Sequence, residues 1–232
     1  MPGNRASEKV REALWIAAML LLVALVHLPW IRVFPLPVEW KPPADTFLGC
    51  VKTAFAGEAG AAYAPTAVIS LAWDYFTTGA AFPRTYRYHS LFGLLCQSAF
   101  LWLFLRRFRL PRIGTLFIVL FCACNPWRIC TVLDPQLRCW IAAPLFCCMA
   151  LWCATWADAR HPLPWMILCA SASFIALGAS PWCALLLAAL PACGWFHHWQ
   201  SGRPLPWKPL LLPEATILLT ALFVFTRIRC LS

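Results

Sequence analysis

Three charged side chains interrupt a strongly apolar part of the chain, in the stretch CNPWRICTVLDPQLRCWI from Cys124 to Ile141. They are Arg128, Asp134 and Arg138, and prolines stand among them. Arginine binds phosphate and carboxylate groups through paired hydrogen bonds, and a carboxylate can accept a proton from a reacting hydroxyl. Each arginine alone could extend from a helix end to the lipid headgroups, but this explains two arginines with an aspartate between them less well.

Further carboxylates lie upstream, between the first two apolar runs. Asp45 precedes the amphipathic run TFLGCVKTAFAG, so it is either the N-cap of a helix or a catalytic group. Glu39 is either a catalytic group or a residue of an interfacial loop. Asp74, within LAWDYF, either pairs with Arg84 or Arg87 or contacts a substrate.

The composition predicts the elements that must position these side chains. Hydrophobic residues make up 62% of the 232 residues and charged residues 12%, and the mean hydropathy is +0.69, which indicates a membrane protein. The net charge of +10 comes from short basic clusters between apolar runs. That distribution is typical of cytoplasmic loops, and we expect no nucleic-acid partner.

Seven spans are expected, because a bilayer core of about 30 Å requires about 20 apolar residues per helix. The apolar windows cover about residues 13–33, 89–105, 113–124, 140–156 and 210–225, with two more spans within 164–195. We predict an all-α, polytopic membrane protein whose residues 1–232 form a single transmembrane domain. It comprises a cytoplasmic N-terminus (1–12), a long first outer loop with short interfacial helices (34–88) and a helical bundle (89–232).

The basic RRFRLPR cluster, from Arg106 to Arg112, follows the second span and indicates that the N-terminus is cytoplasmic. The opening stretch and the loop 34–88 then share the outer face. Most of the 13 cysteines lie inside apolar runs and are expected to be packing thiols. Neither Cys122 with Cys124 nor Cys147 with Cys148 has the spacing of a zinc site, so we predict no metal ligands.

The order of several short motifs resembles the start of the GT-C membrane glycosyltransferases, closest to the transmembrane and tetratricopeptide-repeat mannosyltransferases. The matching residues are Tyr63 and Pro65, Ala72-Trp73-Asp74-Tyr75, the helix from Tyr88 to Arg107, Asn125-Pro126 with Arg138, and Ala176 to Leu190. The resemblance extends from about Leu14 to Phe225. The adjacent aspartates of the family's first outer loop are absent here, where the chain reads PVEWKPPADTFLGC.

The resemblance implies transfer of a sugar from a polyprenyl-phosphate donor to an acceptor on the outer face. Asp45 or Glu39 would be the catalytic carboxylate, and Arg128 and Arg138 would bind the donor phosphate. Asp74 and Asp134 would support them, with Asp134 orienting the two arginines. The cofactor is unknown, and the family chemistry leaves room for a divalent metal.

Two other functions remain open. One is a shortened, non-catalytic relative that binds a lipid or a partner, and the other is a small transporter. A transporter is expected to show two similar halves with broken helices and polar groups at mid-membrane, and neither is evident in the sequence. The expected location is the bacterial inner (plasma) membrane, as a multi-pass protein that contacts the bilayer and a polyprenyl-linked sugar.

Overall fold

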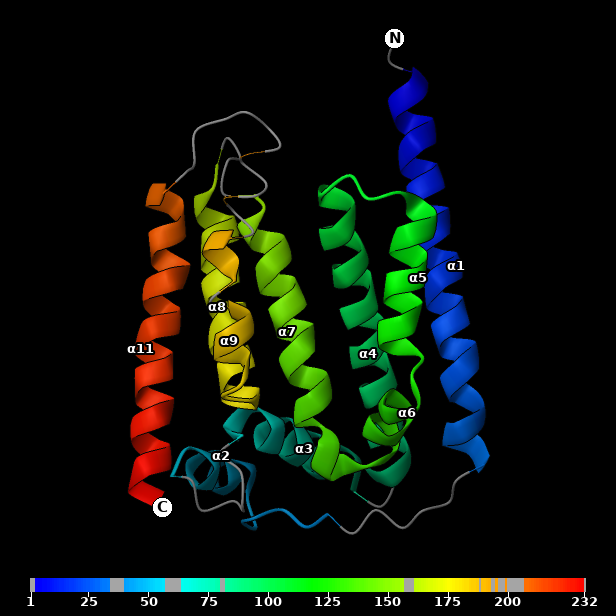
Figure 1. Cartoon of the computed structure of the whole chain (residues 1–232). Coiled ribbons are helices and arrows are strands. Elements are labelled where there is room, and N and C mark those ends of the chain that lie inside the picture. The colour runs from blue at the N-terminus through cyan, green and yellow to red at the C-terminus, as the bar shows by residue number, and fades with distance from the viewer. Residues whose placement is uncertain are drawn as a thin grey trace.

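The computed structural model describes residues 3–33, 40–56, 64–79, 82–156, 161–187, 189–192, 195, 199 and 207–231. Across these ranges the secondary structure is helical, without strands, so the all-α prediction is confirmed. The long helices stand side by side (Figure 1). They are α1 (Gly3–Val33), α4 (Phe82–Arg107), α5 (Arg112–Ala123), α7 (Cys139–Ala154), α8 (Leu163–Ala179) and α11 (Trp207–Leu231), with the short α9 (Cys183–Leu187) beside α8.

Two helices run across one end of this bundle, α2 (Phe47–Ala56) and α3 (Pro65–Thr78) (Figure 1). We call this the α3 end. The short α6 (Pro126–Leu133) lies at the same end, followed by the 3-10 turn η2 (Pro135–Leu137). The N-terminus lies at the opposite end, which we call the N-terminal end, and the C-terminus lies at the α3 end.

Fewer helices are long enough to cross a membrane than the seven predicted. Within the described ranges, three segments are sufficiently long and apolar: Ser7–Val33, Pro83–Arg107 and Pro135–Ala154. The helices α5 and α6 make a fourth span if they are counted together across a bend of 51°. The bend has a local cause: Pro126 begins a new helix and the side chain of Asn125 caps it, accepting a hydrogen bond from the Arg128 backbone at 3.0 Å.

The remaining apolar helices are shorter than a full span. Leu163–Ala179 has 17 residues, and the apolar part of α11 extends over Leu210–Thr226. The sequence windows for these elements were apolar enough, but α8 ends at Ala179, two residues before Pro181. The residue before a proline is disfavoured in the α conformation, which explains the early end.

The crossing helix α3 packs closely against the end of α8. The Thr66 hydroxyl donates a hydrogen bond to the Ile175 carbonyl at 3.1 Å. A Cβ atom on Gly178 would lie only 2.4 Å from that hydroxyl oxygen, so the close approach depends on glycine. This contact fixes the position of α3 beneath the bundle.

Candidate functional site

A buried carboxylate at the α3 end contacts side chains from two other elements. Asp74, on α3, is only 2% exposed. Its Oδ1 lies 2.6 Å from Nδ1 of His89 on α4, and its Oδ2 lies 3.0 Å from Nη2 of Arg138. The His89 side chain is 47% exposed. A surface histidine is therefore in contact with a buried carboxylate.

Arg138 is enclosed by the same group of residues. Its Nη1 donates to the Ser90 hydroxyl at 3.0 Å and to the Tyr86 carbonyl at 3.3 Å. The guanidinium carbon is 5.2 Å from the centre of the Tyr86 ring. We call Asp74, Tyr86, His89, Ser90 and Arg138 the Asp74 cluster. Because its positive charge is matched by Asp74 and it is only 8% exposed, Arg138 is a positioning residue for that carboxylate.

Local structure explains why these side chains converge. Tyr86, His89 and Ser90 are three and four residues apart, so they lie on one side of α4. Arg138 stands where η2 meets α7. The Asp134 carboxylate holds that corner by accepting a hydrogen bond from the Gln136 backbone at 2.9 Å. The three residues of α4 are therefore positioned by that helix, and Arg138 is positioned by the start of α7.

Tyr86 links α4 to the segment that precedes Arg138. It is fully buried, and its hydroxyl donates to the backbone carbonyl oxygens of Asp134 and Thr131, the latter at 3.3 Å. The ring therefore connects α4 to the segment that carries Arg138. This contact places Arg138 over α4, where it meets Asp74.

The structure brings together two of the predicted site residues, Asp74 and Arg138. Arg138 contacts Asp74, on α3, and not Asp45, one of the two carboxylates expected to be catalytic. Asp45 is exposed, and within the described part of the chain it forms no ion pair. It is also not the cap of α2, because the Thr46 hydroxyl accepts the hydrogen bond from the Gly49 backbone at 3.1 Å. Glu39 lies outside the described residues.

Arg128 is separate from these contacts. It is half-buried in the first turn of α6, where its Nη1 donates to the Trp140 carbonyl. Among the described carboxylates none is within ion-pair distance of it. The interpretation that Asp134 orients both arginines was wrong, because its carboxylate caps η2.

The Asp74–His89 pair can perform acid–base chemistry. An ionised carboxylate only accepts hydrogen bonds, so the shared proton resides on Nδ1 of His89. The opposite nitrogen, Nε2, then carries a lone pair that can accept a proton from a hydroxyl. Sequence reasoning missed His89, Tyr86 and Ser90. The only signal was their spacing in the first turns of the helix that begins the second apolar run.

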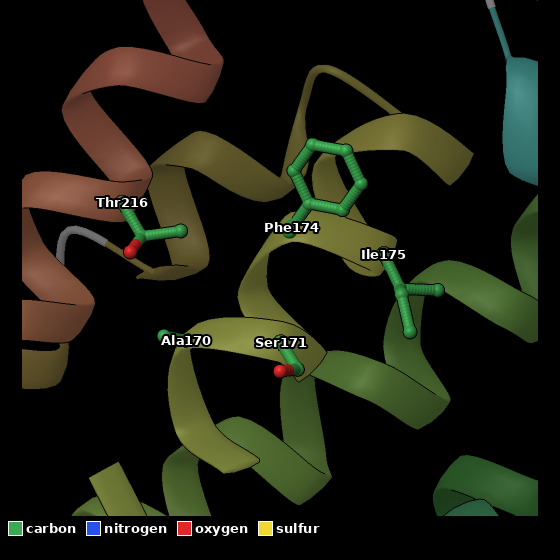
Figure 2. Close-up of a pocket in the computed structure, with 5 residues that line it drawn as sticks. All are labelled: Ala170, Ser171, Phe174, Ile175 and Thr216. Atoms are coloured by element: carbon green, nitrogen blue, oxygen red, sulfur yellow. The ribbon is translucent and has the colours of Figure 1, made fainter. Parts of the chain in front are cut away.

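A shallow pocket elsewhere in the bundle lacks such groups. It has a volume of about 360 Å³ and lies between α8 and α11. Figure 2 shows its lining, which is Ala170, Ser171, Phe174 and Ile175 from α8 and Thr216 from α11. With no charged side chain, this pocket is not suited to acid–base chemistry. No three His, Cys, Asp or Glu side chains within the described ranges are grouped so as to hold a metal ion.

Known proteins do not assign this chain to a family. Comparisons with family models, with curated proteins and with solved structures find no match. The function is therefore inferred from the Asp74 cluster and from the arrangement of the helices around it.

Proposed function

We propose that the chain is a glycosyltransferase-like integral membrane protein that transfers a sugar from a polyprenyl-phosphate donor to a hydroxyl acceptor. The observation that carries this proposal is the contact between exposed His89 and buried Asp74, at 2.6 Å. A transferase of this kind needs a base at the level of the headgroups, where the donor phosphate lies. The apolar helices and the position of the cluster at one end of the bundle support that placement.

His89 is the catalytic base in this proposal. Its Nε2 accepts the proton of the acceptor hydroxyl while the hydroxyl oxygen forms a bond to the anomeric carbon. The bond between that carbon and the donor phosphate oxygen breaks, and polyprenyl phosphate leaves with the electron pair. Asp74 stabilises the imidazolium that forms, as the carboxylate does in other carboxylate–histidine pairs.

The donor phosphate is assigned to Arg128 and no longer to Arg138. Arg138 is held by Asp74, Ser90 and Tyr86, which leaves little of its guanidinium accessible. Arg128 has no carboxylate partner among the described residues and lies at the same end of the bundle. A phosphate would balance a charge that no described carboxylate pairs with.

The proposed topology has seven crossings, a cytoplasmic N-terminus and an inner-membrane location in a bacterium. Its support is the placement of the two ends of the chain at opposite ends of the bundle. The turn between α4 and α5, which carries the RRFRLPR cluster, lies at the N-terminal end, and the Asp74 cluster lies at the other. With basic residues inside, the Asp74 cluster faces outward.

The test uses the full chain in lipid nanodiscs with a radiolabelled polyprenyl-phosphate hexose and a panel of sugar acceptors. The release of polyprenyl phosphate is measured together with donor binding. His89→Ala should lower turnover by about 10²- to 10⁴-fold with donor binding unchanged. Arg128→Ala should weaken donor binding. The control is His161→Ala, because His161 is an exposed histidine just before α8 at the N-terminal end.

A second candidate function is a non-catalytic protein that binds a lipid-linked phosphate. The observation in its favour is the burial of Arg138, which makes the Asp74–Arg138 pair suitable as a purely structural contact. Donor binding that requires Arg128 without any turnover would support this candidate. Turnover that is unchanged in His89→Ala would contradict the proposed transferase mechanism.

A further inference from the structure

A second group of charged side chains lies at the N-terminal end, where α1, α4 and α5 meet. The Glu12 carboxylate accepts hydrogen bonds from Trp102 Nε1 at 2.8 Å, Arg106 Nε at 2.9 Å and Arg112 Nε at 3.1 Å. We call these four residues the Glu12 corner. Since one carboxylate holds two guanidinium groups, the corner keeps a net positive charge.

The charge around the corner is further increased by three exposed cations. Lys9 and Arg11 lie on α1 one turn or less from Glu12, and Arg109 lies in the turn between α4 and α5. Arg109 has a φ of 57°, a conformation uncommon for a residue with a side chain. Glu8 is the only additional carboxylate in this part of the described chain. This region of the described chain therefore holds five cationic residues and two carboxylates.

One of these arginines also has unused donors. Arg112 contacts Glu12 through Nε, and its terminal nitrogens have no partner among the residues that the structure describes. Its side chain is 27% exposed, so those donors can reach a ligand. A phosphate group matches paired guanidinium donors in charge and geometry.

Apolar side chains adjoin the charged corner on α5. Ile113 and Phe117 are 63% and 70% exposed and lie one turn apart on that helix. Ile113 directly follows Arg112 in sequence. The surface therefore combines phosphate-binding donors with an apolar face along α5, which fits a molecule that carries a phosphate and acyl chains. A nucleic acid would leave that apolar face unused.

We infer that the Glu12 corner, with Arg11 and Arg109, binds the headgroup of an anionic phospholipid whose acyl chains lie along α5. The headgroup phosphate is bound by Arg109 and by the terminal nitrogens of Arg112. The Glu12 carboxylate positions Arg112 and Arg106, so the site is formed before the lipid arrives. This site is independent of the proposed transfer reaction, which takes place at the other end of the bundle.

The experiment uses the full chain purified in a neutral detergent. Binding of phosphatidylglycerol and of phosphatidylcholine is measured by native mass spectrometry. Phosphatidylglycerol should bind preferentially, and Arg11→Ala/Arg109→Ala should reduce that preference by about five-fold for each cation removed. The control is Lys52→Ala/Arg84→Ala, because these exposed cations lie on α2 and at the start of α4, at the α3 end.

The control variant should keep the preference for phosphatidylglycerol, and thermal unfolding without added lipid should be the same for both double variants. Equal binding of the two lipids by the unmodified chain would overturn the inference. So would loss of the bound lipid in millimolar inorganic phosphate, which would indicate a site for the free anion. An equal loss of preference in both double variants would also overturn it, because the effect would then come from net charge and not from this corner.

Discussion

Asp74 differs from the other described carboxylates because both of its oxygens contact charged or polar partners while it is almost completely buried. The contact with Arg138 is an ion pair at 3.0 Å. Removing one partner of such a pair leaves the other charge buried without a counter-charge, which strongly destabilises the folded protein.

Replacing Asp74 by Asn should therefore reduce the free energy of unfolding by about 3–5 kcal/mol. Arg138 would remain buried without a counter-charge. Thermal unfolding of the purified chain in detergent measures the change. Adding Arg138→Met to Asp74→Asn should recover part of the loss, because the unpaired charge is then removed.

Asp45→Asn is the matched control for this substitution. Asp45 is exposed and forms no ion pair within the described ranges, so its replacement should change stability by less than about 0.5 kcal/mol. If Asp45→Asn destabilises the protein as much as Asp74→Asn does, the assignment of the ion pair is wrong.

The sequence singled out Arg138 and Asp74 as candidate site residues, but it did not pair them. Each stands out as a charge in apolar surroundings, which a single sequence reveals. Their contact depends on where α3 packs beneath α8 and on how the Tyr86 hydroxyl fixes the segment before α7. These are long-range contacts without a local sequence signature. His89 was missed for the same reason, because its role comes from the carboxylate beside it.

At the scale of the helices, the packing of α3 on α8 decides whether Asp74 reaches its partners. Gly178 permits the close approach, and the Thr66 hydroxyl makes the hydrogen bond across it. The apolar windows predicted the positions of α1, α4 and α7 well. They did not predict the crossing direction of α3, since amphipathic periodicity indicates a helix and not the surface against which it packs.

Gly178→Ala should destabilise the protein by about 1–3 kcal/mol, because the new methyl group would displace Thr66 and with it α3. Thermal unfolding checks the stability. Adding Thr66→Ala should relieve most of the clash, although the hydrogen bond to Ile175 is then lost.

Gly114→Ala provides the control for the added methyl group. Its Cβ would meet only the ring of Pro111, at an ordinary contact distance of 3.4 Å. This substitution should leave stability unchanged or raise it slightly, since alanine favours helix more than glycine does. An equal loss of stability in both variants would show that the Gly178–Thr66 contact is not the cause of the destabilisation.

For the whole molecule, the positions of the two termini at opposite ends of the bundle can be tested directly. The N-terminus and the turn after α4 lie at one end, and the C-terminus lies at the other (Figure 1). Seven crossings would place the two termini on opposite sides of a membrane. Among the described helices, however, only three are long and apolar enough to cross one, or four if the bent pair is counted as one span.

A reporter fused after Arg112 should be active in the cytoplasm, and one fused after Ser232 should be active on the outer side. The reason is that the proposed topology has seven crossings, an odd number, between the N-terminus and the C-terminus. Alkaline phosphatase and green fluorescent protein fusions measure the two sides. Both reporters on the same side would contradict the proposed topology.

The ion pair of Asp74 also sets an order for the insertion of the chain during synthesis. α3 is synthesised well before η2 and α7. Asp74 therefore has no Arg138 partner while the intervening helices are being made. Burial of an unpaired carboxylate is costly, so α3 cannot settle under the bundle until that arginine arrives. A released chain truncated after Leu133 should leave α3 open to protease, and one truncated after Ala179, which contains both Arg138 and α8, should protect it. The Asp74–Arg138 ion pair is therefore expected to form late in the assembly of the protein.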